Sequence, residues 1–256
     1  MTIVLTAECN YDSGRPSSSF EKLTPTMFSP LQDFYPLYPA LGEFINPHSL
    51  KIHLTQHIRV INAKYDQALS SYNTLTSGNI NLQIPADGPN FQELSSITST
   101  LYQYKFSVEE IIYHMRRILD TLVQITYLMT NGEEFNADQI IKFDAIGKVK
   151  NGEDSHPELY SIIHGDNGNY TSDNTQFLKV INDVFNSFKH SLIHNESNMV
   201  MGAEIPTVVS YYAKHGRYSD ITFHNHNLTH IMMGFNDNLV RILNNQRVYL
   251  NRNHSA

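Results

Sequence analysis

The stretch Ser107–Gly132, SVEEIIYHMRRILDTLVQITYLMTNG, decides the fold class of this chain. Its apolar residues recur at every third or fourth position, which is the spacing of the buried face of an α-helix. They are Ile111, Met115, Ile118, Leu119, Leu122, Ile125 and Met129. Ser107 and Glu110 predict a capping box where this helix begins, and Asn131–Gly132 predicts its end.

The same spacing predicts further long helices on both sides of this stretch. They are a helix from Asn46–Pro47 to Leu69, a helix from Asn174 or Thr175 to Asn195, and a last helix from Asn227 to Asn244. The final residues NRNHSA (251–256) predict a frayed tail. Another helix begins near Phe91–Leu94, with a break expected before Ser107, and residues 137–147 predict a short helix before a polar loop over 148–173. Helices of about 20 residues pack most easily as an antiparallel bundle.

Two other segments complete the predicted layout. TVVSYYAK and SDITFH flank HGRY, and these β-branched and aromatic runs predict a β-hairpin with Gly216 in its turn. Residues 1–45 combine prolines with aromatics and predict an arm packed on a single helical domain, residues 46–256. The predicted fold class is therefore all-α: an antiparallel bundle of four to five main helices, a proline-rich N-terminal arm and a small β-hairpin before the last helix.

Composition excludes several classes of protein. The net charge of −7 argues against a protein that coats DNA, which would be basic. The single cysteine, Cys9, allows no internal disulfide, which fits a reducing compartment. The first residues do not have the pattern of a signal peptide, and no run of about 18 apolar residues predicts a membrane span. We therefore expect a cytoplasmic protein without a membrane partner.

One constellation of polar residues lies at the end of the helix that reaches Asn195. Lys189, His190 and His194 fall within one and a half helical turns, and the two histidines share one face. A cation beside a histidine can hold a phosphate while the imidazole acts as general acid or base near neutral pH. A solvated helix end, with its cations near the negative end of the helix dipole, explains the same residues without a site.

This constellation resembles the motif of the HEPN domains of bacteria and archaea, whose ribonuclease members carry Arg, a polar residue and a more distant His. Lys189, His190 and His194 stand in those places, and the resemblance covers about residues 100–245. It implies a helical bundle, an RNA partner, cleavage without metal or cofactor, and a homodimer with its active site across the dimer. Lysine offers phosphate a point charge, whereas arginine offers a bidentate fork. This departure from the motif favours an alternative, a non-catalytic module that binds a protein partner.

Histidine pairs open a third possibility, a metal-binding protein. His53 and His57, His190 and His194, and His226 and His230 are each four positions apart, so each pair could chelate an ion from one helical face. None of the pairs has the His-Glu-x-x-His form of a zinc protease.

Residues 38–69 resemble the first helix of the iron/manganese superoxide dismutases. That resemblance implies His53 as the first metal ligand and His57 as its second-shell neighbour, with His114, Asp220 and His224 as the remaining ligands. The chain departs from that family because Ile61 replaces a tyrosine and tryptophan is absent. The sequence thus leaves open whether the protein is an enzyme, and it leaves three functions: an RNA-directed effector, an interaction module and a metal-binding protein.

Overall fold

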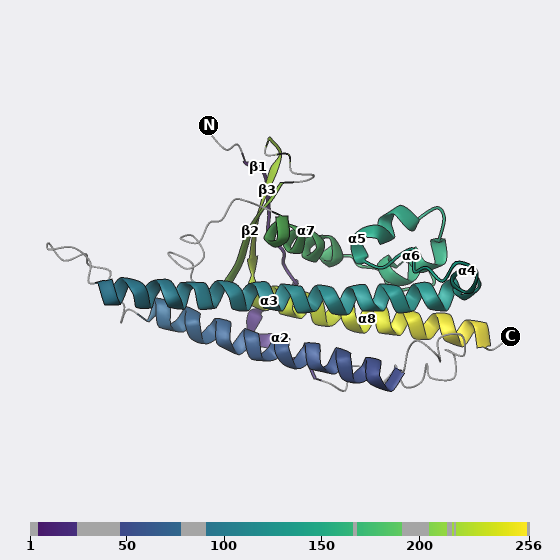
Figure 1. The fold of residues 1–256 in the computed structure, drawn as a ribbon, viewed down its shortest axis with the longest axis horizontal. Helices are drawn as coiled ribbons and strands as arrows, with labels where there is room; N and C mark the ends of the chain where they lie inside the picture. The colour runs from purple at the N-terminus through teal and green to yellow at the C-terminus, as the bar shows by residue number, and fades with distance from the viewer. Residues whose placement is uncertain are drawn as a thin grey trace. The chain divides into compact units, whose positions relative to one another are not determined.

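The computed structural model describes residues 5–24, 47–77, 91–165, 168–190, 205–213, 217 and 219–254. These residues are mostly helical and include a small three-stranded sheet (Figure 1). The helices are α2 (Pro47–Thr76), α3 (Phe91–Thr130), α4 (Gly132–Asp138), α5 (Ile146–Val149), α6 (Pro157–His164), α7 (Phe177–His190) and α8 (Leu228–His254). Short 3₁₀ turns lie at Ser17–Ser19 and Lys150–Gly152.

The sheet corrects the expectation of an all-α fold. It contains β1 (Leu5–Cys9), β2 (Thr207–Ala213) and β3 (Ile221–Asn227) in the order β1-β3-β2 (Figure 1). β2 pairs with β3 in antiparallel register, which confirms the predicted strand pair, while the proposed turn at Gly216 lies outside the described residues. β1 pairs in parallel with β3, and this partner is too distant in the chain for local spacing to reveal.

The helix that decides the fold class is longer than its capping signal predicts. α3 runs without interruption through Ser107, so the predicted break and the capping box at this residue are wrong. The Ser107 hydroxyl instead donates to the Gln103 carbonyl at 2.7 Å, as a serine inside a helix often does. Buried Tyr104 continues the apolar face toward the N-terminus, so packing carries the helix past a residue that could have begun it.

The segment between α3 and α7 contains more helix than expected. The predicted helix over 137–147 is wrong. α4 begins earlier, at Gly132, and ends before Gln139, which adopts a left-handed conformation with φ of 54°. The expected polar loop over 148–173 contains α6, which begins with Pro157 and buries Leu159, Ile162 and Ile163. The last helix, expected to end near Asn244, continues to His254, so residues 251–254 of the tail expected to be frayed are helical.

Tertiary contacts divide the chain into two compact units. The first comprises Met1–Phe20, Val60–Tyr113 and Asp183–Met232, and the second comprises Glu21–Arg59, His114–Asn182 and Met233–Ala256. The predicted division into an arm and one helical domain stays a prediction, because residues 25–46 lie outside the described part of the chain. Among the described residues, no helix combines the length and hydropathy needed to cross a membrane.

Buried hydrogen bonds of two tyrosines hold the elements of the first unit together. The Tyr104 hydroxyl donates to the backbone carbonyl of Thr207 in β2 at 2.6 Å. Tyr65 of α2 and Thr229 at the start of α8 share a bond of 2.9 Å between their hydroxyls. A buried tyrosine hydroxyl needs such a partner, so the first bond fixes α3 against β2 and the second fixes α2 against the start of α8.

In the second unit, α8 supplies the polar side chains that hold α6 and the segment after it. Arg241 donates to the carbonyls of Ile163 at 2.8 Å and Thr171 at 3.1 Å. Asn245 donates to the carbonyl of Ile162 at 3.0 Å. These carbonyls lie at or beyond the end of α6, where helix geometry leaves them without an intrahelical partner.

Candidate metal centre

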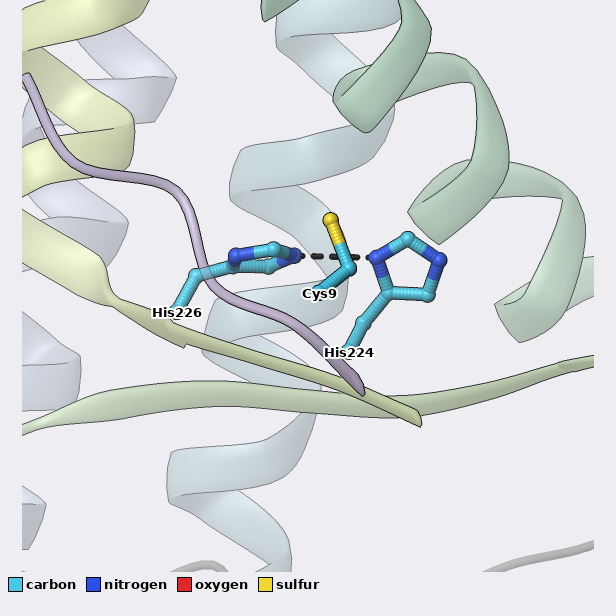
Figure 2. Close-up of side chains that lie close together, drawn as sticks. All are labelled: Cys9, His224 and His226. Carbon is cyan, nitrogen blue, oxygen red and sulfur yellow. Dashed lines mark hydrogen bonds between the residues drawn. The ribbon is translucent and has the colours of Figure 1, made fainter. Parts of the chain in front are cut away.

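The sheet brings together three residues with metal-binding side chains. Cys9 is the last residue of β1 and pairs with His224 in the neighbouring strand β3. His224 and His226 are two positions apart, so their side chains leave the same face of β3. Figure 2 shows the Cys9 sulfur beside the two imidazole rings, with a hydrogen bond between the rings.

The three side chains converge closely. The Cys9 sulfur and one nitrogen of each histidine all lie within 4.8 Å of one another. His224 and His226 are buried, with 1% and 0% of their surface exposed, whereas Cys9 is half-buried at the end of its strand. Ligands from two strands thus meet at one point, and Cys9 is the least buried of the three.

Hydrogen bonds select the ring nitrogens that face this point. The backbone N–H of Tyr11 donates to Nδ1 of His226 at 2.8 Å, so this nitrogen carries no proton. Nε2 of neutral His226 therefore carries the ring proton and donates it to Nδ1 of His224 at 3.0 Å. His226 Nε2 and His224 Nδ1 are consequently the two nitrogens that an ion between the rings would bind.

Burial keeps the imidazole of His226 neutral. Desolvation, followed by the neighbouring His224, lowers the pKa of His226 to about 3. Only a neutral or deprotonated imidazole binds a metal ion, because protonation removes the lone pair. The environment therefore disfavours the imidazolium form of His226, and the proton on Nε2 must still leave before this nitrogen can bind an ion.

The distances suit a tetrahedral ion after a small adjustment. Two nitrogens bound to zinc at 2.0–2.1 Å lie about 3.3 Å apart, compared with the 3.0 Å between the two rings. A thiolate and two imidazoles select borderline or soft ions such as zinc and copper over magnesium and calcium. The donor set therefore fits zinc or copper.

A second group of histidines lies in the other unit. His57 of α2 places Nδ1 at 2.5 Å from Nδ1 of His114 in α3, and its Nε2 at 3.0 Å from Nε2 of His53. The Nε2 atoms of His53 and His57 face each other from one helix, so an ion between them would have these two protein ligands. His114 would then contact the second ring nitrogen of His57, as a residue behind the ligand. Three residues of the dismutase-like set thus come together.

The remaining members of that set lie elsewhere in the chain. His224 belongs to the cluster with Cys9 and His226, and Asp220 is exposed immediately before β3. Lys189 and His190 are both exposed at the end of α7, whereas His194 lies outside the described residues. The structure therefore describes two of the three residues of the RNA-directed motif.

The stability of the chain should depend on the protonation of His57. Desolvation, followed by charges at His114, His53 and Arg117, lowers the pKa of His57 to about 4. The folded state disfavours protonated His57, so its contribution to stability is complete above pH 6.5 and is lost as pH falls toward about 4. We expect the free energy of unfolding to fall less over this range in His57→Gln than in the natural chain.

Urea unfolding at a series of pH values checks this expectation, because it reports the free energy directly. His190→Gln is the matched control, since His190 is exposed at a helix end. Equal acid sensitivity of His57→Gln and the natural chain would contradict the assignment.

Sequence reasoning misses two of the three residues of the metal centre. It includes His224 only as part of another ligand set, gives Cys9 no ligand role, and pairs His226 with His230 on a helix. In the structure His226 belongs to a strand, where positions two apart share a face. The alternating His224-Asn225-His226, which continues past the end of the predicted strand SDITFH, is the signal that could have found the pair.

Comparison with known proteins adds no relative to this picture. No protein-family model, no curated protein and no solved structure matches the chain.

Proposed function

We propose that this protein binds a transition-metal ion through Cys9, His224 and His226. The observation that carries the proposal is the convergence of one sulfur and two nitrogens within 4.8 Å, from strands at opposite ends of the chain. Three protein ligands leave a fourth tetrahedral position for water, as in catalytic zinc sites and unlike closed structural ones. The half-buried cysteine leaves that position a route to solvent.

Cobalt titration of the metal-free protein tests this proposal. Cobalt(II) takes the place of zinc and gives a thiolate-to-metal absorption band only when a cysteine sulfur binds it. We expect the band to saturate at one ion per chain and to vanish in Cys9→Ser, while His190→Gln retains it. A natural chain that binds no cobalt, or binds it without the thiolate band, would rule the site out.

The pair His53 and His57 is the second position at which the histidine-based hypothesis places an ion. Its ligands are imidazoles only, so cobalt there would give no thiolate band. Cobalt that remains bound in Cys9→Ser and is lost in Cys9→Ser/His57→Gln would assign it to this pair. The two positions can thus be separated in one titration series.

A second candidate function is the RNA-directed one. We infer it from the exposure of Lys189 and His190 side by side at the end of α7, where a phosphate can reach both. The order of a long helix, α3, followed later by α7 supports a HEPN-like bundle with antiparallel helices. In this proposal Lys189 holds phosphate, His194 is the general acid or base and His190 orients it, in a homodimer.

Cleavage of a mixed RNA pool in excess EDTA tests the second candidate. If it is right, the natural chain cleaves without metal and His194→Ala loses about a hundredfold or more in rate, because it lacks the general acid or base. Lys189→Ala should weaken RNA binding through the loss of a phosphate contact. Cleavage and binding that do not respond to either substitution would end this candidate, and light scattering would test the dimer separately.

A further inference from the structure

A separate group of polar side chains surrounds the start of α6, in the second unit. Ser155 and His156 are the two residues before this helix, and Glu134 belongs to α4. The Ser155 hydroxyl oxygen lies 2.8 Å from Nδ1 of His156. Nε2 of the same ring lies 3.0 Å from Oε2 of Glu134. A hydroxyl, an imidazole and a carboxylate are thus joined in one continuous chain of hydrogen bonds.

The carboxylate in this chain is firmly ionised. Lys142 contacts Oε1 of Glu134 at 2.5 Å, and the Tyr127 hydroxyl donates to Oε2 at 3.0 Å. The hydrogen bond from Lys142, followed by that from His156, lowers the pKa of Glu134 to about 2. Glu134 can therefore only accept hydrogen bonds at neutral pH.

The ionised carboxylate determines which ring nitrogen of His156 carries the proton. Because Glu134 only accepts, Nε2 of neutral His156 must donate to it. Nδ1 is then a lone pair, and the Ser155 hydroxyl donates its proton to this lone pair. His156 thus has the tautomer and the hydrogen bond that a general base needs to activate a serine.

Packing holds the base while the hydroxyl remains accessible. The ring of His156 contacts Phe143 with 4.7 Å between ring centroids, and its side chain is only 13% exposed. The ring centroid of Tyr127 lies 6.0 Å from that of His156. Ser155 itself is exposed. A rigid base behind a solvent-accessible hydroxyl is the arrangement that nucleophilic catalysis requires.

We propose that Ser155, His156 and Glu134 form a hydrolytic triad that cleaves small carboxylic esters. Ser155 is the nucleophile, His156 the general base and acid, and Glu134 a positioning residue that fixes the imidazole. The ring nitrogens exchange roles relative to the common serine-hydrolase arrangement, since Nδ1 faces the serine here, but each nitrogen performs the same proton transfer.

The reaction proceeds in two balanced steps. Oγ of Ser155 bonds to the ester carbonyl carbon as its proton passes to Nδ1 of His156; the bond to the alcohol oxygen breaks, and this oxygen takes the proton and leaves. Water then bonds to the acyl carbon while Nδ1 accepts its proton, and the bond to Oγ breaks as the proton returns to Ser155. The sum is ester plus water giving acid plus alcohol, with no other reactant.

Charge near Ser155 indicates which esters are preferred. Glu153, Asp154 and Glu158 flank the serine in the chain, and all three are exposed. Negatively charged surroundings repel an anionic substrate, so neutral or cationic esters should react faster than anionic ones. α6 begins at Pro157, which has no backbone N–H, so the N–H groups of Glu158 and Leu159 are the first that this helix can offer to the developing oxyanion.

Hydrolysis of 4-nitrophenyl acetate by the full chain in excess EDTA tests the proposal. EDTA removes any ion from the proposed metal centre, so the outcome is independent of that site. We expect a burst of nitrophenol followed by turnover, and a loss of about a hundredfold or more in Ser155→Ala, the usual range for a missing base-activated nucleophile. Ser70→Ala, at an exposed serine of α2, should keep the full rate.

Labelling identifies the nucleophile directly. Diisopropyl fluorophosphate should modify Ser155 in the natural chain and leave His156→Ala unmodified, as seen by peptide mass spectrometry. Glu134→Gln should react at a rate reduced at least tenfold with an unchanged thermal midpoint, since it alters the imidazole tautomer rather than the fold. Equal hydrolysis by Ser155→Ala, or a label on another residue, would overturn the proposal.

Discussion

The affinity of the protein for zinc should rise about a hundredfold for each pH unit between roughly pH 5.5 and 7.5. Binding at the proposed centre must remove two protons. One is the thiol proton of Cys9, because the thiolate is the ligand. The other is the proton that His226 Nε2 shares with His224 Nδ1, since the Tyr11 backbone N–H occupies the other nitrogen of His226. Each proton released raises the binding constant tenfold per pH unit.

Competition with a chelator of known affinity, repeated at several pH values, measures this slope. Cys9→Ser provides the internal comparison, because its remaining imidazole pair gives up one proton and the slope should fall to about tenfold per pH unit. A slope of tenfold in the natural chain would mean that the imidazole pair keeps its proton. The ion would then bind outside the position between the two rings.

Gly165→Ala should destabilise the fold by about 4 kcal/mol, a value in the exceptional range for single substitutions. Gly165 follows α6 with φ of 84°, a conformation that disfavours a side chain. A Cβ at this position would lie 2.3 Å from the Cα of Ser172 and 2.4 Å from the carbonyl oxygen of Thr171. Both are backbone atoms, and Arg241 and Asn245 already hold the Thr171 carbonyl in place.

Gly14→Ala is the matched control, because Gly14 has φ of 72° but a Cβ added there would meet no neighbouring heavy atom within 4 Å. It carries only the conformational penalty, about 1–2 kcal/mol. Urea unfolding of both variants gives the two free energies, and their difference measures the steric clash. Equal destabilisation would show that residues 171 and 172 move aside at little cost.

Local spacing is sufficient for the long helices and for one strand pair. The apolar faces of α2, α3, α7 and α8 repeat within a few residues, and the partners in β2 and β3 are separated by a short connection. The same reasoning cannot find β1, whose partner β3 lies at the far end of the chain. Ser107 shows the opposite error, in which a strong local signal is overridden by the packing of Tyr104.

The candidate sites follow the same rule. His53 and His57 can be paired from sequence because helical spacing determines their distance, and the structure adds His114 from another helix. Cys9 and His226 cannot be joined without the parallel register of β1 and β3. Ser155 and His156 are neighbours in the chain, but their link to Glu134 depends on how α4 and α6 meet. Sites formed by residues from distant segments can therefore be found only once the fold is known.

The contact between Tyr11 and His226 spans 215 residues, and this separation has a consequence for the newly made chain. At a synthesis rate of about 5–20 residues per second, β1 leaves the ribosome roughly 10–40 s before its partner strand. During that interval the Cys9 thiol has neither its neighbouring strand nor the two imidazoles beside it. Oxidants therefore have their best access to this cysteine during translation, and sheet closure reduces its exposure to half-buried.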